Sequence, residues 1–290
     1  MFIGIDLGGT KIAGVLVTPS GKVLMDVTIP TEAKRGKKHI IDNIDKAIHM
    51  LKQSKKVKIN GIGIGAPGPI DYEKGIVVEA PNLPGWKRVR LKEIFQRKYK
   101  IPVYVDNDAN CAALAEAWFG AGRNARHFLY MTVSTGIGGG IVINKKIYRG
   151  ANGSAGEFGH MVIDSKGPRC GCGHIGHLEA YASGTAIRRR TGMRALAVEL
   201  AARQGDKKAQ KIIQEIASYL AIGIANLVNI FNPEMIVIGG GLSNMRELLF
   251  NPIRKEFKKY ALTLPARKVK IVRAKLGTDA GVLGAAALCL

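Results

Sequence analysis

Two cysteines and three histidines lie within a stretch of eighteen residues, at His160, Cys170, Cys172, His174 and His177. Thiolates and imidazoles are the ligands that tetrahedral zinc prefers, and the glycines between them would let the chain wrap around an ion. A cysteine pair separated by one residue is better suited to shared chelation than to a disulfide. We therefore expect a structural Zn²⁺ ion bound by His160, Cys170 and Cys172, with His177 favoured over His174 as the fourth ligand.

Carboxylate and amide side chains form a second group of candidate residues. Asn107 and Asp108 follow an apolar run and precede a helical pattern, where Asn and Asp also serve as plain helix caps. The carboxyl edge of a strand is the usual ligand site of an α/β sheet, so these side chains could instead bind hydroxyls and accept a proton. Asp108 is the expected base. Glu157 and Glu179 add acceptors close in sequence to the metal ligands, as a polyhydroxylated ligand requires.

A glycine-rich turn near the start of the chain could bind phosphate. It contains Asp6, Gly8, Gly9, Thr10 and Lys11, and it lies between two apolar runs that are expected to be strands. Glycines allow an anion to approach the backbone amides closely. No helix follows the turn, so the segment is neither a Walker A loop nor a dinucleotide-binding fingerprint. A tight turn without a ligand is the alternative.

Two further glycine turns favour the phosphate interpretation. Residues 134–140 include Thr135, Gly136 and Gly138 and again follow an apolar run. Two such turns in matching positions of two domains could bind one phosphate chain. Gly240 and Gly241 belong to a third turn, between a strand and a helix, where a base or a ribose could lie on the backbone. A plain connecting turn is the alternative there.

The pattern of apolar runs and turns predicts an α/β protein with a repeated organisation. We expect strands at residues 2–6, 11–17, 23–29, 57–65, 103–106, 127–133, 141–144, 147–148, 235–238 and 269–272. We expect helices at residues 38–53 and 91–99, after residue 108 to about 120, across 178–231, and from about 243 and 277. Between them lie a glycine- and proline-rich stretch at 66–86 and a loop at 150–176.

The repetition of a strand meander with a glycine turn predicts two domains. We place the boundary near residues 110–120, which gives an N-terminal domain at 1–115 and a C-terminal domain at 116–290. The last helix could pack back on the N-terminal domain. A length of 290 residues fits this division.

The charge balance is strongly basic. Forty-four Lys and Arg against 22 Asp and Glu give a formal charge of +22, which favours anionic ligands without choosing among them. Four cysteines make no disulfide framework in a chain of this size and favour a reducing compartment. The start of the chain is typical of a core strand and not of a signal peptide, and no uninterrupted apolar run could span a bilayer. We expect a cytoplasmic protein without a membrane partner.

These segments together resemble the ROK family of sugar kinases and repressors, and especially its ATP-dependent glucokinases. The resemblance covers nearly the whole chain and is carried by residues 6–11, 107–110, 134–140, 157–160 and 170–179. It implies two actin-like, ribonuclease H-like α/β domains with an interdomain cleft. It also implies ATP-dependent phosphorylation of a hexose at the 6-hydroxyl. Glucose is the first candidate, and N-acetylmannosamine, N-acetylglucosamine, fructose, mannose and allose are alternatives.

The resemblance implies roles for individual residues. Asp108 would be the general base, while Asn107, Glu157, His160 and Glu179 would hold sugar hydroxyls. The first two glycine turns would bind the phosphates of ATP, and the aspartate of the first turn would lie near Mg²⁺. The Zn²⁺ ion would be structural, with one ring nitrogen of His160 on the metal and the other free to orient a ligand.

One position departs from the family pattern. The family usually has a third cysteine where this chain has His177. Two thiolates and two imidazoles would leave the zinc site formally neutral, which could weaken the hold on the metal. We still expect zinc to bind.

Two other functions are compatible with this family. A sugar-responsive transcription regulator would need a DNA-binding element, and the first phosphate strand begins at residue 2, which leaves no room for an N-terminal helix-turn-helix. We therefore expect no sequence-specific nucleic-acid partner. Inorganic polyphosphate could replace ATP as the donor, given the positive charge. A homodimer or a dimer of dimers is the expected assembly.

Overall fold

The computed structural model describes residues 1–53, 57–80 and 82–290, and the chain divides into two compact units. Unit 1 comprises Met1–Arg123, Lys145–Ala155 and Thr278–Leu290, and unit 2 comprises Asn124–Asn144 and Gly156–Gly277. The chain thus first leaves unit 1 after Arg123. The boundary expected from the sequence was near residues 110–120. The C-terminal helix belongs to unit 1.

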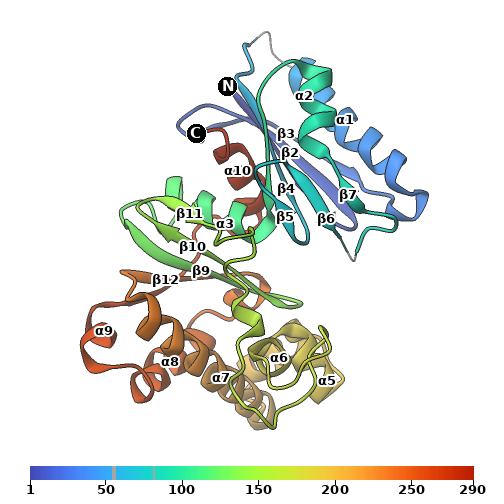
Figure 1. Ribbon diagram of the computed structural model, residues 1–290. Coiled ribbons are helices and arrows are strands. Elements are labelled where there is room, and N and C mark those ends of the chain that lie inside the picture. Colours follow the sequence, from blue (N-terminus) through green and yellow to red (C-terminus); the bar gives the residue numbers. More distant parts are fainter. Residues whose placement is uncertain (54–56, 81) are drawn as a thin grey trace. The chain divides into compact units, whose positions relative to one another are not determined.

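Unit 1 is built on a five-stranded sheet, drawn in blue and teal in Figure 1. Its strands are β1 (Phe2–Leu7), β2 (Lys11–Val17), β3 (Val23–Pro30), β4 (Gly61–Ala66) and β8 (Val103–Asn107), in the order β3-β2-β1-β4-β8. The first three strands form an antiparallel meander, as predicted. β4 pairs in parallel with β1, and β8 pairs in parallel with β4. The parallel strands therefore end at one edge of the sheet, where β8 leads into the proposed catalytic segment.

Helices cover both faces of this sheet. They are α1 (Lys37–Gln53), α2 (Leu91–Tyr99), α3 (Asp108–Trp118) and α10 (Ala280–Ala287). On one face, Leu51 of α1 and Ile5 both lie next to Gly14, in the space that a Cβ atom on this glycine would need. On the other face, α10 approaches so closely that a Cβ atom on Gly4 would overlap its main chain. Because successive strand residues point to opposite faces, Gly4 and Ile5 mark the two sides.

A second, smaller sheet begins in the stretch at 66–86 that we expected to be merely glycine- and proline-rich, and it ends just beyond that stretch. It contains β5 (Ile70–Asp71), β6 (Ile76–Glu79) and β7 (Lys87–Val89), paired antiparallel in that order. These strands are two to four residues long, too short to show an alternation of apolar and polar side chains.

The second five-stranded sheet repeats the order of the first. Its strands are β9 (His127–Val133), β10 (Ile137–Ile143), β11 (Lys146–Tyr148), β12 (Met235–Gly239) and β13 (Lys270–Arg273), in the order β11-β10-β9-β12-β13. β10 is antiparallel to β9, whereas β12 and β13 are parallel to their neighbours. The matching order and strand directions confirm the predicted duplication and the actin-like, ribonuclease H-like fold.

The remaining helices belong to unit 2. They are α4 (Leu178–Ala182), α5 (Gly184–Thr191), α6 (Ala195–Arg203), α7 (Lys207–Phe231), α8 (Glu247–Glu256) and α9 (Thr263–Lys268). Helix α7 is long and apolar enough to cross a membrane by length and composition alone. However, 56% of its most apolar window is buried inside the protein, as expected for a core helix.

Several predicted limits were wrong, each for a local reason. Strand β4 begins at Gly61 and not at residue 57. Glycines 138–140 are not part of a turn, because β10 begins at Ile137 and pairs along its whole length with β9. The helix expected from about residue 243 is interrupted, since Arg246 has a left-handed backbone and α8 starts only after it. Short 3-10 helices occur at Ala33–Arg35, Phe158–His160, Gly241–Met245, Phe257–Lys259 and Gly277–Asp279.

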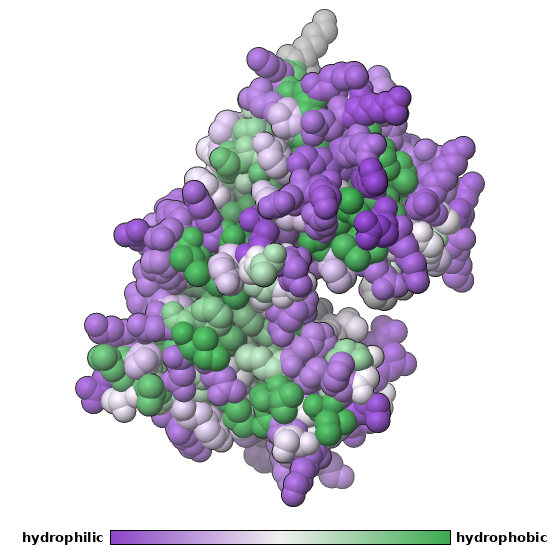
Figure 2. Space-filling model, in the orientation of Figure 1, coloured by the Kyte–Doolittle hydropathy of each residue, from purple (hydrophilic) through white to green (hydrophobic). Residues whose placement is uncertain are grey.

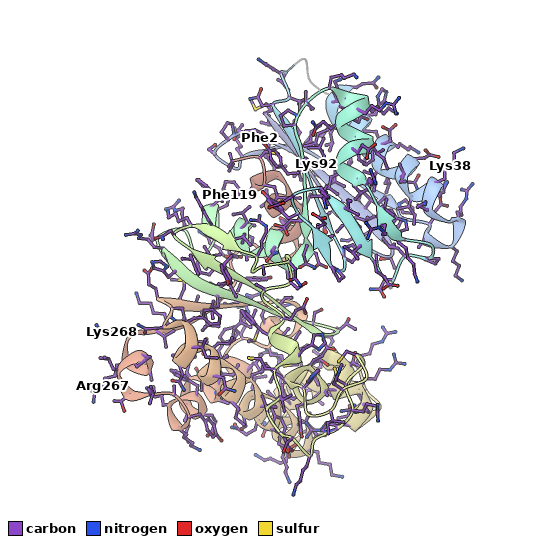
Figure 3. The ribbon with its side chains drawn as sticks, viewed as in Figure 1. Phe2, Lys38, Lys92, Phe119, Arg267 and Lys268 are labelled. Atoms are coloured by element: carbon purple, nitrogen blue, oxygen red, sulfur yellow. The ribbon has the colours of Figure 1, made fainter. Side chains whose placement is uncertain are left out.

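Exposed basic residues occur in both units. Figure 2 shows hydrophilic residues over most of the visible face, with hydrophobic residues in smaller groups. Basic side chains such as Lys38 in unit 1 and Arg267 and Lys268 in unit 2 extend outward in Figure 3, and all three residues are exposed. This distribution gives an anion-attracting surface without pointing to one partner.

Candidate active site and metal centre

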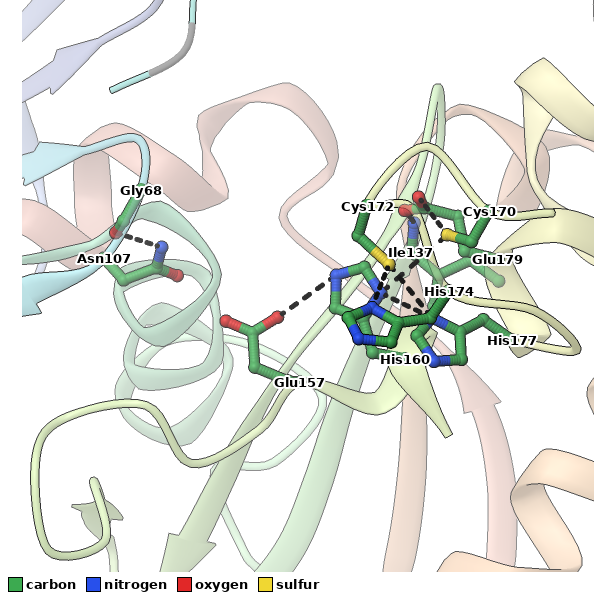
Figure 4. A network of polar contacts seen from close by, with 10 residues as sticks. All are labelled: Gly68, Asn107, Ile137, Glu157, His160, Cys170, Cys172, His174, His177 and Glu179. Carbon is green, nitrogen blue, oxygen red and sulfur yellow. Dashed lines mark hydrogen bonds and ion pairs between the residues drawn. The ribbon is translucent and has the colours of Figure 1, made fainter. Parts of the chain in front are cut away.

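The proposed catalytic segment lies where β8 ends and α3 begins. Asn107 is the N-cap of α3: its Oδ1 accepts a hydrogen bond from the backbone N of Ala109 at 2.9 Å. Its Nδ2 donates to the carbonyl oxygen of Gly68 at 3.1 Å, a contact drawn in Figure 4. Asp108 is the first residue of the helix and is exposed. Asn107 therefore caps the helix, while the neighbouring Asp108 has an accessible carboxylate.

The first glycine turn is held in shape by hydrogen bonds. The backbone N of Gly8 donates to the carbonyl oxygen of Lys11 at 3.0 Å, which closes the hairpin between β1 and β2. Thr31, at the end of β3, donates from Oγ1 to the carbonyl oxygen of Gly8 at 2.7 Å and from its backbone N to that of Thr10 at 2.9 Å. Thr31 is fully buried, and the sequence analysis missed it because nothing in its local pattern distinguishes it.

Asp6, at the end of β1, has an unusual electrostatic environment. Burial, and after it the nearby Asp108, raise the pKa of its carboxyl to about 6, although Lys11 opposes both effects. Its Oδ2 atom lies only 2.6 Å from the position that a Cβ atom on Gly281 would occupy, at the start of α10. The carboxylate is thus confined between a strand end and a helix, next to the phosphate turn. A cation bound there would favour its ionised form.

The second and third glycine turns lie together in unit 2. Gly240 has a positive φ of 80°, and a Cβ atom there would overlap the backbone of Val133, directly before the second turn. Gly241 approaches Ser134, since a Cβ atom on it would lie 3.7 Å from the Ser134 Oγ. Glycine is therefore required at position 240 for the close approach of these two turns.

A cavity of about 440 Å³ opens beside these two turns. Its lining includes Thr135 and Gly241, which were predicted, and Thr185, Arg188 and Asn244, which were not. The size and the mixture of glycine backbone with cationic and polar side chains suit a nucleotide. Larger cavities of about 780, 760 and 540 Å³ lie elsewhere among the described residues and contain none of the predicted site residues.

Glu179 connects the second glycine turn with the metal cluster. Its Oε2 accepts a hydrogen bond from the backbone N of Ile137 at 2.8 Å, and a Cβ atom on Gly136 would overlap this oxygen. Its Oε1 lies 3.7 Å from the Sγ of Cys170. One carboxylate oxygen therefore fixes the turn, in addition to any role in sugar binding.

Four of the predicted metal ligands converge, as Figure 4 shows. One ligand atom each from His160, Cys170, Cys172 and His177 lies within 4.8 Å of the others. The Nδ1 atoms of His160 and His177 are 3.2 Å apart, the Cys172 Sγ is 3.2 Å from the His177 Nδ1, and the Cys170 Sγ is 3.9 Å from the His160 Nδ1. A tetrahedral zinc site has edges of about 3.4 Å between nitrogens and about 3.6 Å between sulfur and nitrogen. The residues present fit this ion.

His174 lies at the margin of the cluster. Its ring stacks on that of His177 with centroids 5.7 Å apart, and its Nδ1 is 3.6 Å from the Cys172 Sγ. It is exposed, whereas His177 is buried. The converging set contains His177 and not His174. Burial and the neighbouring histidines lower the pKa of His177, which favours the neutral imidazole that ligates metals.

The second ring nitrogen of His160 points away from the cluster. Its Nε2 is 3.9 Å from a carboxylate oxygen of Glu157, and both side chains lie in unit 2. Glu157 itself is exposed. One imidazole therefore offers Nδ1 to the metal cluster and Nε2 to the carboxylate that was predicted to bind sugar.

Known proteins are similar to this chain along nearly its whole length. The glucokinase of Thermotoga maritima is 40% identical over 99% of this chain and 96% of its own length. The xylose repressor of Caldicellulosiruptor bescii is 37% identical over 99% of this chain and 77% of its own length. A solved structure of a ROK family glucokinase from Streptomyces griseus, in complex with glucose and AMPPNP, is 36% identical, with a TM-score of 0.83 over 99% of this chain and 98% of that one. The ROK family model matches residues 2–290, and the chain belongs to the ROK family.

Proposed function

We propose that this protein transfers the γ-phosphoryl group of ATP to the 6-hydroxyl of a hexose, with glucose as the preferred acceptor. The observation that carries the proposal is the exposed carboxylate of Asp108 at the carboxyl edge of β8, beside a second carboxylate and a glycine turn. Similarity to glucokinases supports the same assignment. We place this activity in the cytoplasm.

In the proposed reaction, Asp108 accepts the proton of the attacking hydroxyl as the phosphoryl group is transferred. Asn107, Glu157, His160 and Glu179 hold the other sugar hydroxyls. The protein forms no covalent bond to the phosphoryl group in this reaction. Catalysis then consists mainly of positioning the two substrates and stabilising the charge of the transition state.

The nucleotide is assigned to the glycine turns. Residues Gly8, Gly9, Thr10 and Lys11 of the first turn, and residues Thr135, Gly136 and Gly138 of the second segment, would contact phosphates. Gly240 and Gly241, with the 440 Å³ cavity beside them, would accommodate the base and ribose. Asp6 would approach Mg²⁺ through water, and that ion would offset the charge on the β- and γ-phosphates.

The metal cluster is assigned to structural zinc. His160, Cys170, Cys172 and His177 would hold the ion, which would supply a rigid cross-link between two loop segments. His160 would thereby be fixed with its Nε2 directed toward Glu157. A homodimer or a dimer of dimers is the proposed assembly.

A sugar-responsive regulator is the second candidate function, because repressors match this chain along almost its whole length. A kinase for an amino sugar is a third, since a Listeria monocytogenes protein described as an N-acetylmannosamine kinase has a similar structure. Both alternatives make clear predictions: a regulator binds sugar without turnover, and an amino-sugar kinase turns over N-acetylmannosamine faster than glucose.

An ADP-release assay with ATP, Mg²⁺ and a panel of hexoses and amino sugars tests the proposal. Inorganic polyphosphate is run as an alternative donor. We expect the largest kcat/KM with ATP and glucose, and an unchanged value in Asp26→Asn, which removes an exposed carboxylate of the same unit. If none of the sugars is turned over, the kinase proposal is overturned. A preference for another sugar would overturn only the choice of glucose.

A further inference from the structure

A buried aspartate directly precedes the proposed catalytic pair. Asp106 is only 2% exposed. Its Oδ1 accepts hydrogen bonds from the backbone N of Asn107 at 2.8 Å and from the Nδ2 of Asn110 at 3.0 Å. These two donors lie on either side of Asp108 in the chain. One carboxylate oxygen therefore braces the turn that carries the proposed base.

The other oxygen of this carboxylate binds Arg149. The Oδ2 of Asp106 accepts from the Nε of Arg149 at 2.9 Å and lies 2.8 Å from its Nη2. The guanidinium carbon lies 3.5 Å from the ring centroid of Tyr72, and Nη1 donates to the carbonyl oxygen of Ile147 at 3.4 Å. All of these residues belong to unit 1. An arginine that is held by one carboxylate oxygen through two of its nitrogens, by an aromatic ring and by a carbonyl has little freedom to turn.

The ion pair is more than a neutralising contact for a buried charge. A buried carboxylate that loses its cation is left with an uncompensated charge, which favours its rotation toward water. That rotation would alter the Oδ1 bonds to Asn107 and Asn110, because both oxygens belong to one rigid group. The orientation of Asp108 would change with them, although Arg149 lies 43 residues from Asp106 in sequence.

We propose that Arg149, supported by Tyr72, is a positioning residue for phosphoryl transfer. It fixes the carboxylate of Asp106, and through Asp106 it orients Asp108 toward the sugar hydroxyl. This inference rests on the proposed function of Asp108 as the base. Tyr72 limits the guanidinium to the plane in which its Nε and Nη2 atoms reach Asp106.

The test compares the steady-state kinetics of four variants with ATP and glucose. Arg149→Met removes the cation, Arg149→Lys keeps the charge but loses the two-pronged contact, and Tyr72→Leu removes the ring while leaving the ion pair. Arg97→Met, which removes an exposed arginine of the same unit, is the matched control. Thermal unfolding of each variant identifies any that fail to fold.

We expect kcat to fall about 100-fold in Arg149→Met, as for a misplacement of a catalytic group by about 1 Å, with a much smaller change in the KM for glucose. Arg149→Lys and Tyr72→Leu should lie between this variant and the control. In Arg149→Ala, added methylguanidinium should restore part of kcat, because it can reoccupy the space beside Asp106. A purely structural role would not give that rescue at unchanged melting temperature.

The outcomes separate this inference from the proposed function. An active wild-type protein, with Arg149→Lys and Tyr72→Leu as fast as Arg97→Met, would overturn the inference alone. The same holds if Arg149→Met does not fold and the other two variants keep their full kcat. A wild-type protein without turnover on any sugar would overturn both.

Discussion

Replacing Asp6 by Asn should change how the stability of the protein depends on pH. The pKa of this carboxyl is raised from 3.8 to about 6, first by burial and then by Asp108, with Lys11 opposing. The folded protein therefore binds a proton at this site more tightly than the unfolded chain does. The resulting stability is fully present below about pH 4 and is lost as the pH rises through about 6.

The size of the effect follows from the two pKa values. A shift from 3.8 to about 6 corresponds to about 3 kcal/mol between acidic and neutral pH, and remaining contact with solvent reduces this figure. Between about pH 5 and about pH 7.5, linkage gives a change of about 1.4 kcal/mol. Any effect of Asp6→Asn that does not depend on pH cancels in this comparison.

Urea denaturation at these two pH values measures the effect directly. The free energy of unfolding of Asp6→Asn, minus that of the wild type, should become more positive by about 1.4 kcal/mol from about pH 5 to about pH 7.5. Asp26→Asn controls for the loss of one exposed carboxylate from unit 1. Parallel stability curves for Asp6→Asn and the wild type would refute the argument that burial of Asp6 opposes its ionisation.

Further predictions concern the turns and the metal cluster. Gly136→Ala should raise the KM for ATP several-fold, because its Cβ atom displaces Glu179 from the backbone of the second turn; an unchanged KM would be inconsistent with that geometry. Thr31→Val should lower the free energy of unfolding by about 1–3 kcal/mol and raise the KM for ATP, since it leaves the carbonyl of Gly8 without its 2.7 Å donor; denaturation and kinetics together check this. His174→Ala should retain about one zinc per chain by metal analysis, and a protein without zinc would show that His174 is a ligand.

Long, regular elements could be predicted from the sequence, whereas some of the shortest could not. The meander of β1, β2 and β3 was predicted because each strand is an apolar run bounded by turn residues. The three-stranded sheet of unit 1 was missed because its strands are only two to four residues long and lie among glycines and prolines. The meaning of a glycine run was also ambiguous, since residues 138–140 turned out to be a paired strand.

In the candidate site, too, only some of the residues could be predicted from the sequence. The cluster of His160, Cys170, Cys172 and His177 could be predicted because its ligands are chemically distinctive and close in sequence. Supporting residues carry no such signal. Thr31 and its partner are 23 residues apart, and Arg149 and its partner are 43 residues apart, so only the folded chain brings each pair together.

The assignment of Asp108 as the base of a sugar kinase is tested by the single-turnover rate of glucose 6-phosphate formation in wild type and Asp108→Asn, with glucose binding measured on the same samples. We expect the phosphorylation rate of Asp108→Asn to fall by at least about 100-fold while its glucose affinity stays within a few-fold of the wild-type value. Phosphorylation by Asp108→Asn at a rate close to that of the wild type would contradict this assignment.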